Sequence, residues 1–245
     1  LKRLWDPVLM SVEFVWDNAD GIRHNFSHAS IRYCPGLFIA AAPCAELASS
    51  DSGDLDLGVR MMAFTSWLDL ICKVKVKHII CLLSDEDASQ WYRDLGDGDL
   101  STTCRGQGLT FHHTVLPAKF AAPSAAALAD AIAALKRLPS LAGLEDSAVI
   151  ICADGRHTSA LVAAAWLVLE CGQGEADAIS AVEASAAEVG VSRAPLECFR
   201  ELPGEASEAF AALLAEARAL ASGLEAPTAA PDPKPMSGGL ETLDK

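Results

Sequence analysis

A short apolar strand that runs directly into a long apolar helix is the feature that most limits how this chain can fold. The strand candidate covers Ala148 to Cys152, a turn with Asp154 and Gly155 follows, and the helix extends from about Ser159 to Glu170. A buried strand joined by a tight glycine turn to an apolar helix is a building unit of α/β proteins. The rest of the chain should therefore supply further strands beside this one, with helices on both faces of the sheet.

Strand and helix candidates alternate along the remaining sequence. The strand candidates are Leu37–Ala41, His78–Leu83 and Leu109–Val115, and the helix candidates cover 59–74, 124–139, 175–188 and 205–222. The connection from Ser84 to Gly108 is longer than a usual loop, so we expect it to be partly helical around 88–92. The alternation predicts an α/β fold with a central mixed, partly parallel sheet flanked by helices.

Composition divides the chain into three parts. Residues 1–36, in which Val12, Phe14 and Trp16 alternate, are expected to form an N-terminal arm or edge strand. Residues 37–221 are expected to form the α/β domain. Residues 222–245 are rich in Pro, Gly and Ala, which predicts an extended C-terminal tail. Since such a tail does not fold alone, other protein subunits are the expected partners, and the tail is the expected point of contact.

The charge of the chain excludes two classes of partner. Its 19 basic and 33 acidic residues give a net charge of -14, which repels nucleic acid and anionic membrane surfaces. The longest apolar run, Ala160 to Leu169, is about half the length that a transmembrane helix needs, so no transmembrane segment is expected.

The eight cysteines include no CxxC pair, which argues against a metal site and favours buried thiols in a reducing compartment. Because the chain starts at Leu1, an organelle such as a plastid, reached by a targeting peptide that is then removed, is one prediction for its location, and the cytoplasm is the alternative. The sequence has no nucleotide P-loop, no dinucleotide-binding glycine triplet and no HExxH, so no cofactor is expected.

The turn after the strand that ends at Cys152 predicts an anion-binding site. A glycine turn between a buried strand and a helix directs backbone N–H groups and the positive end of the helix at one point. The same field would stabilise a thiolate at Cys152 and make it a nucleophile at neutral pH. The alternative is an inert thiol in the core.

Residues 149–167 resemble the signature strand, loop and helix of the dual-specificity and tyrosine phosphatases. That signature is a cysteine, five residues, an arginine and then Ser or Thr, with glycine third after the cysteine. Cys152, Gly155 and Ser159 match it. Further similar segments are Lys77–Leu83, Phe111–Ser124 and Ala176–Ala186, so the resemblance spans roughly residues 30–220. It implies a phosphatase-like fold with Cys152 and Ser159 at the catalytic positions.

Two departures from the signature concern the groups that catalysis needs. Thr158 stands where the family has the arginine that holds the phosphoryl oxygens, and Arg156 lies two residues too early, so we expect its side chain to point outward. Asp154 adds a negative charge to an anion cradle. Lys119 stands where the family has its aspartate general acid, and no Asp or Glu occurs between Leu109 and Ala129.

These losses favour an inactive member of the family. A missing general acid costs roughly 10²–10⁴ in rate and a missing charged donor roughly 10²–10³ more, together about 5–10 kcal/mol of transition-state stabilisation. The leading hypothesis is a pseudophosphatase that acts as a protein-binding or structural subunit, with Cys152 as a vestigial nucleophile and Gly155, Arg156 and Thr158 as remnants of the anion site. Two alternatives remain open. One is an active phosphatase that uses Arg156 and an acid such as Asp85 or Glu86, and the other is a phosphopeptide or anion sensor without turnover.

Other polar residues have ordinary structural explanations. His112 and His113 are adjacent on a strand, so their side chains face opposite sides and do not share a metal. His78 begins a buried strand and is expected to make a hydrogen bond. The acidic run from Asp85 to Asp87 could bind a cation or a basic partner, but it is interpreted as a solvated loop.

Overall fold

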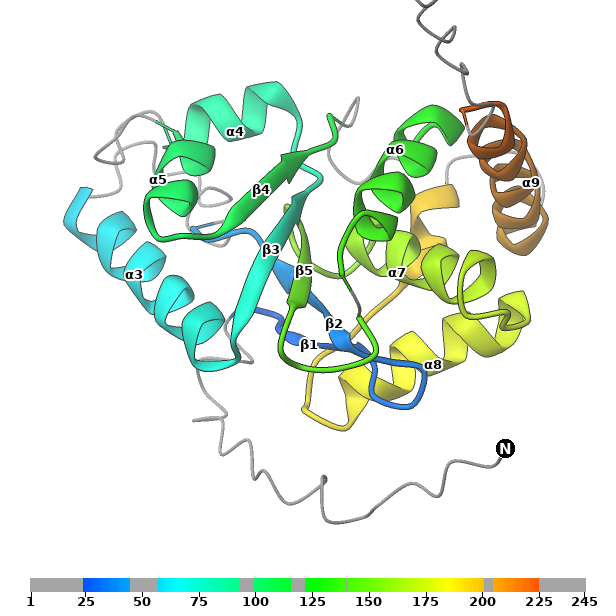
Figure 1. Ribbon diagram of the computed structural model, residues 1–245, viewed down its shortest axis with the longest axis horizontal. Coiled ribbons are helices and arrows are strands. Elements are labelled where there is room, and N and C mark those ends of the chain that lie inside the picture. Colours follow the sequence, from blue (N-terminus) through cyan, green and yellow to red (C-terminus); the bar gives the residue numbers. More distant parts are fainter. Residues whose placement is uncertain are drawn as a thin grey trace, which may run out of the picture.

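Five strands form one mixed sheet in the computed structural model, which describes residues 24–44, 57–92, 99–115, 122–139, 141–200 and 205–224. The strands are β1 (Ser27–Ser30), β2 (Cys34–Ala41), β3 (Val76–Cys81), β4 (Thr110–His113) and β5 (Ser147–Cys152). Their order in the sheet is β1-β2-β5-β3-β4 (Figure 1). β1 pairs with β2 in antiparallel fashion, and all other neighbours are parallel. The predicted mixed, partly parallel sheet is confirmed.

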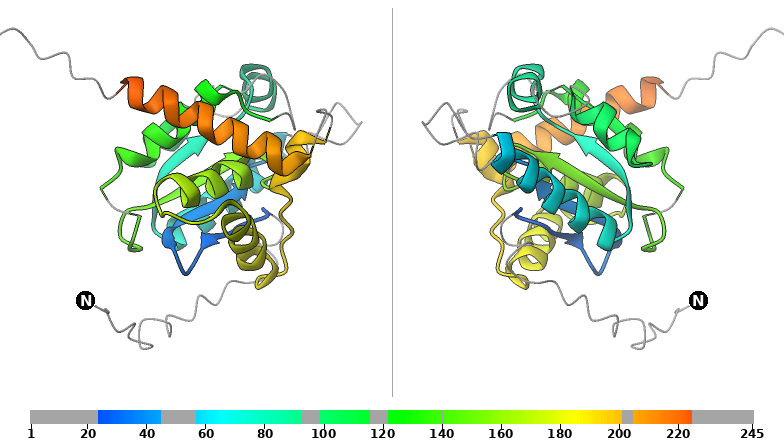
Figure 2. Two further views of the ribbon diagram at one scale, coloured as in Figure 1. Left: turned by 90° about the vertical axis from the view of Figure 1, so that its right-hand side faces the viewer. Right: turned by 90° about the vertical axis from the view of Figure 1, so that its left-hand side faces the viewer.

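Helices cover both faces of this sheet (Figures 1 and 2). One face carries α3 (Leu57–Lys73), α4 (Asp85–Tyr92) and α5 (Leu100–Gly106). The other face carries α6 (Ala125–Lys136), α7 (Thr158–Leu169), α8 (Glu175–Ala187), the 3₁₀ helix η2 (Pro195–Phe199) and α9 (Ala206–Leu224). Within the second layer, α9 packs on α6, α7 and η2. The predicted α/β class with flanking helices is confirmed.

The apolar runs of the central strands are buried on both faces because successive side chains point to opposite sides. Phe38, Val149 and Ile79 pack in the cluster under α3, α4 and α5. Leu37, Ile150 and Ile80 pack in the cluster under α6, α7 and α9. By the same alternation, the side chains at the ends of β5 and β3 diverge. Cys152 belongs to the α7 side and Cys81 to the α4 side.

The predicted start of α6 and the predicted end of α7 agree with the structure. The Ser124 side chain accepts a hydrogen bond from the backbone N–H of Ala127 at the start of α6, as a serine N-cap should. Gly172, just beyond α7, has φ +68°, the left-handed conformation that ends many helices.

Three elements differ from the expectation. β3 ends at Cys81 rather than Leu83, although Leu82 and Leu83 are buried and the Leu82 N–H still donates to the Ile151 carbonyl. α5 was not predicted, since it is only one to two turns long and is held by the Asp99 N-cap, whose carboxylate accepts from Thr102 N at 2.7 Å. The acidic run from Asp85 to Asp87 is the first turn of α4 rather than a loop, where carboxylates favour the positive helix end.

Several predictions concern residues outside the described ranges. These are the strand with Val12, Phe14 and Trp16, the position of Lys119 and the tail beyond Leu224. The three-part division into 1–36, 37–221 and 222–245 therefore stays a prediction, although part of the arm forms the edge strand β1 and α9 runs to Leu224. Within the described part of the chain, no helix has the length and apolar character needed to cross a bilayer.

Candidate functional site

The candidate site lies where the parallel strands end. β2, β5, β3 and β4 all finish at the same edge of the sheet, and β5 lies between β2 and β3. The connections on the two sides of this point use helices on opposite faces of the sheet, and such a point is where open α/β sheets bind ligands. The loop 153–157 leaves β5 here and enters α7.

Gly155 sets the path of this loop. Its φ of +67° is a conformation that residues with a side chain rarely adopt. A Cβ at Gly155 would lie 2.3 Å from the backbone nitrogen of Ala41 and 2.5 Å from the carbonyl carbon of Ala40. The loop is therefore pressed against the end of β2. It is also held from the other side, because the Asn25 side-chain amide donates to the Asp154 carbonyl at 2.8 Å.

The N–H groups of the loop are taken by a side chain of the loop itself. Oδ1 of Asp154 accepts from the backbone N–H of Arg156 at 2.8 Å and more weakly from that of His157 at 3.4 Å. The other carboxylate oxygen lies 2.5 Å from Nδ1 of His157, with which it forms an ion pair when the imidazole is protonated. The Asp154 carboxylate thus occupies donors that an external anion would need, and its charge opposes the entry of a second anion.

Cys152 is a buried thiol beside two oxygen groups. Its Sγ lies 3.1 Å from Oγ of Ser159 and 3.5 Å from Oδ1 of Asp154. Burial and the negative charge of Asp154 raise the pKa of Cys152, against the lowering effect of hydrogen bonds from Ser159 and the loop backbone. Burial and the charge of Asp154 therefore act against the expected thiolate at Cys152 and favour the alternative of a neutral thiol in the core. The state of Cys152 at neutral pH stays a prediction.

The alkylation rate tests whether the Cys152 thiol is enclosed and protonated. In the native protein at neutral pH, iodoacetamide is expected to modify the exposed Cys72 well before Cys152, with a rate ratio of about 100 or more, since only the exposed thiolate reacts. Peptide mass spectrometry of a time course measures both sites, and a urea-unfolded sample in which the two react alike is the control. Equal rates in the native protein would contradict the protonated state.

The side chains of Arg156 and Thr158 point to different neighbours and do not meet at one anion-binding position. Arg156 is exposed, and its Nη2 donates to Oγ of Ser192 at 3.1 Å, in keeping with the expected outward direction. Thr158 is buried at the start of α7, with its Oγ1 3.9 Å from Sγ of Cys198. Of the predicted site residues, the structure brings Cys152 and Ser159 into contact, and it does not bring Arg156 to them.

A second arginine near the loop was not foreseen. Arg193, between α8 and η2, is only 6% exposed, and its Nη2 donates to the carbonyl of Asn25, to Oγ of Ser27 at 3.0 Å and to the carbonyl of Ile39 at 3.2 Å. Its Nε and Nη1 are buried and find no hydrogen-bond partner among the described residues.

Two opposing effects set the pKa of the Arg193 guanidinium. Burial lowers its pKa to about 10, while the nearby Cys152 and Asp154 act in the opposite direction. The guanidinium is therefore still charged at neutral pH. Nothing local in the sequence marks this residue, because its partners lie more than 150 residues away along the chain.

The remaining polar candidates have structural partners. His112 Nε2 lies 2.9 Å from Oδ2 of Asp130, which also accepts from Thr114 at 2.7 Å, and these hydrogen bonds lower the pKa of Asp130 although burial acts against them. Nδ1 of His78 lies 2.6 Å from Oγ1 of Thr110, so the expected hydrogen bond of His78 is present. No cluster of His, Cys, Asp and Glu suited to a metal occurs in the described ranges.

At the end of the central strand β5, a cysteine, a glycine loop and an apolar helix follow one another in the order expected from the sequence. Solved structures similar to this chain include dual-specificity and tyrosine phosphatase-like proteins, the family that residues 149–167 resemble.

Three of these structures illustrate the likeness. PTPMT1 in complex with PI(5)P is 16% identical, with a TM-score of 0.47, over 80% of this chain and 98% of that one. Human DUSP28 is 16% identical, with a TM-score of 0.44, over 80% and 95%. The human tyrosine phosphatase-like serine/threonine/tyrosine-interacting protein is 14% identical, with a TM-score of 0.47, over 80% and 96%. At these values the likeness carries no information on activity, substrate or partner. No protein-family model matches the sequence, and comparison with curated proteins finds no match.

Proposed function

We propose that this chain is a phosphatase-like protein that does not turn over phosphate esters and that serves as a non-catalytic, protein-binding or structural subunit. The observation that supports the proposal most is the position of Asp154, whose carboxylate accepts the N–H groups of Arg156 and His157. A substrate phosphate would need these donors, and it would meet a carboxylate where a complete site offers positive charge.

Other groups around the loop also support the absence of turnover. The raised pKa of Cys152 leaves little thiolate at neutral pH, and no guanidinium occupies position 158 to stabilise charge in the transition state. The arginine that would have to compensate is otherwise engaged, since Arg156 bonds Ser192. This contact disfavours the alternative of an active phosphatase built on Arg156.

Turnover of an aryl phosphate tests the proposal directly. The unmodified chain is expected to hydrolyse p-nitrophenyl phosphate at a rate at least about 10⁴-fold below that of a complete site, with no difference between it and Cys152→Ser. A steady-state colorimetric assay of both proteins decides the matter. Hydrolysis that disappears in Cys152→Ser would refute the proposal.

A rebuilt loop provides the matched comparison. The variant Asp154→Ala frees the two N–H groups, and adding Thr158→Arg returns a guanidinium to the position where the related phosphatases have one. Tungstate should raise the melting temperature of the double variant and leave that of the unmodified chain unchanged. Asp69→Ala, which removes an exposed carboxylate from α3, controls for the single charge that Asp154→Ala removes.

One observation favours a second candidate, an anion or phosphopeptide sensor without turnover. The buried Nε and Nη1 of Arg193 lack partners, and the charge of Arg193 acts on the Cys152 and Asp154 region. An anion that displaced the Asp154 carboxylate could use these nitrogens. Tungstate binding by the unmodified chain, weakened in Arg156→Met or in Arg193→Met, would favour this candidate over a purely structural subunit.

The partner and the compartment remain proposals of the same kind. We propose that other protein subunits bind this chain, with residues 222–245 as one point of attachment. All eight cysteines, each in the described ranges, are free thiols, which suits the reducing compartment expected from the sequence. Whether that compartment is a plastid or the cytoplasm stays a prediction.

A further inference from the structure

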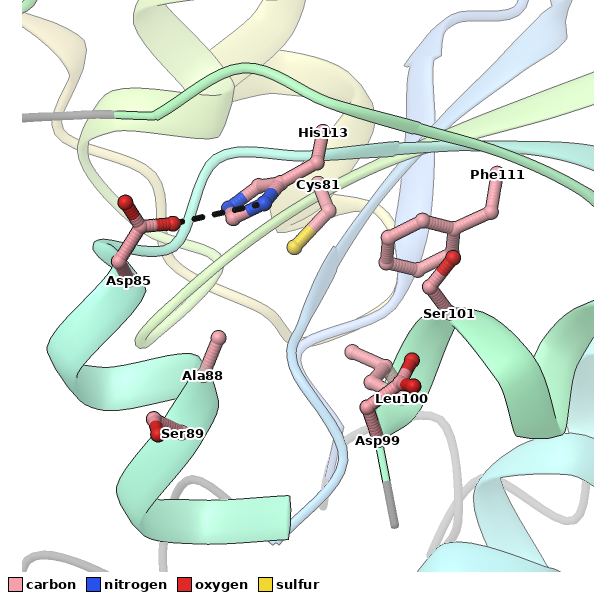
Figure 3. Close-up of a pocket in the computed structure, with 9 residues that line it drawn as sticks. All are labelled: Cys81, Asp85, Ala88, Ser89, Asp99, Leu100, Ser101, Phe111 and His113. Carbon is pink, nitrogen blue, oxygen red and sulfur yellow. Dashed lines mark ion pairs between the residues drawn. The ribbon is translucent and has the colours of Figure 1, made fainter. Parts of the chain in front are cut away.

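A pocket of about 300 Å³ opens between α4, α5 and the ends of β3 and β4 (Figure 3). Asp85 and Ala88 of α4 form one side, and Leu100 of α5 with Phe111 of β4 forms the other. The pocket lies on the α4 side of the sheet, whereas the side chain of Cys152 belongs to the α7 side. It is therefore separate from the loop described above.

The imidazole of His113 faces a carboxylate across the rim of this pocket. Nε2 of His113 lies 2.8 Å from the carbonyl oxygen of Leu83. A carbonyl only accepts hydrogen bonds, so Nε2 is the donor, and in the tautomer that carries this one proton Nδ1 is an acceptor. Nδ1 lies 3.9 Å from Oδ1 of Asp85, and both point toward the same opening (Figure 3). Two acceptors at this separation are suited to a donor that bonds both.

The walls of the pocket favour a cation with an apolar stem. Burial raises the pKa of Cys81 to about 12, so its thiol is neutral and its sulfur is part of the apolar lining. Phe111 and Leu100 add aromatic and aliphatic surface, and Asp99, whose carboxylate accepts from Thr102 as the cap of α5, adds a negative charge at the edge. Among the described residues that line the pocket, none is a lysine or an arginine. With a net charge of -14 on the chain, the pocket attracts cations and repels anions.

We propose that this pocket binds an alkylammonium group. The ammonium donates to Nδ1 of His113 and to Oδ1 of Asp85, and the methylene stem packs against Phe111 and Leu100. A volume of about 300 Å³ is at the small end for ligand sites, which suits a short aliphatic chain and excludes a large ligand. Lysine side chains and free amines both carry this group, because each joins a charged nitrogen to an apolar stem.

The site does not depend on the proposed function. Its residues belong to α4, α5, β3 and β4 and include none of the loop 153–157, so amine binding and phosphatase inactivity can fail separately. A lysine from a partner protein would nonetheless give the chain a specific contact with that partner.

Titration of the full chain with n-butylammonium at about pH 8, where imidazoles are mostly neutral, tests the site. Calorimetry or amide chemical shifts report binding, and n-butanol, which has the same stem without the charge, is the matched control. We expect butylammonium to bind at least about tenfold more tightly than butanol. Equal binding of the two, or no binding of butylammonium, would overturn the proposal without any variant.

Two variants locate the binding within the pocket. Asp85→Asn and His113→Phe should each weaken butylammonium by about tenfold, whereas Asp69→Asn, an exposed carboxylate change on α3, should leave it unchanged. Unchanged affinity in folded Asp85→Asn would contradict the site.

A peptide with one central lysine distinguishes a protein side chain from a free amine as the source of the ammonium group. If it binds as tightly as butylammonium, the natural ligand is a protein side chain, and if it does not, a free amine is indicated, with the pocket supported in either case.

Discussion

Replacing Gly155 by alanine should lower the free energy of unfolding by about 2–5 kcal/mol, a large part of the 5–15 kcal/mol typical of a domain. Two costs add at this position. The left-handed φ of +67° costs an alanine roughly 1–2 kcal/mol. Its Cβ would also lie 2.3 Å from the backbone nitrogen of Ala41, and relieving such an overlap costs about 1–3 kcal/mol. Urea denaturation followed by circular dichroism measures the sum.

Two other glycines separate the contributions. Gly172 has φ +68° with open space around the added Cβ, so Gly172→Ala should cost about 1 kcal/mol. A Cβ at Gly36 would lie 2.2 Å from the carbonyl oxygen of Gly143, without a positive φ, so Gly36→Ala reports the overlap alone. If Gly155→Ala were no more destabilising than Gly172→Ala, the loop would not be pressed against β2, and its closed shape would need another cause.

Replacing Arg193 by methionine should lower the free energy of unfolding by about 2–4 kcal/mol. Its guanidinium joins three acceptors, and removing it leaves the buried Ser27 hydroxyl and Ile39 carbonyl without their donor, at about 1–3 kcal/mol each. Relief from burying a charge with two unpartnered nitrogens offsets part of this loss. Thermal and urea unfolding of the variant and the parent chain provide the measurement.

Comparison with Arg156→Met separates a buried from an exposed arginine. Arg156 makes one exposed hydrogen bond to Ser192, so its loss should change the stability by less than about 0.5 kcal/mol. Should Arg193→Met prove as stable as the parent chain or more so, the desolvation of the guanidinium would outweigh its hydrogen bonds, as happens for some buried ion pairs. Arg193 would then be retained for a reason other than stability, such as binding an anion.

Local patterns explain why much of the fold could be predicted from the sequence. The spacing of apolar residues in α3, the Ser124 cap of α6 and the strand, glycine turn and helix around Gly155 all act over a few residues. Such signals reported the α/β class, most helix bounds and the position of Cys152 at the end of a buried strand. They missed α5, because a helix of seven residues has too few turns to show a period.

What the sequence determined by itself is the set of groups available at the loop. It has a cysteine, a glycine, an aspartate and a threonine, so the absence of a guanidinium at position 158 follows from the sequence alone. Only the tertiary structure decided how the remaining groups are used. The Asp154 carboxylate bonds N–H groups two and three residues further on, which is a local contact, but the loop that carries it is held by Asn25 and by the end of β2. The burial of Arg193 depends on acceptors in β1 and β2. These partners are distant in the chain and meet only because the sheet order brings the edge hairpin beside β5, and no local pattern encodes that meeting.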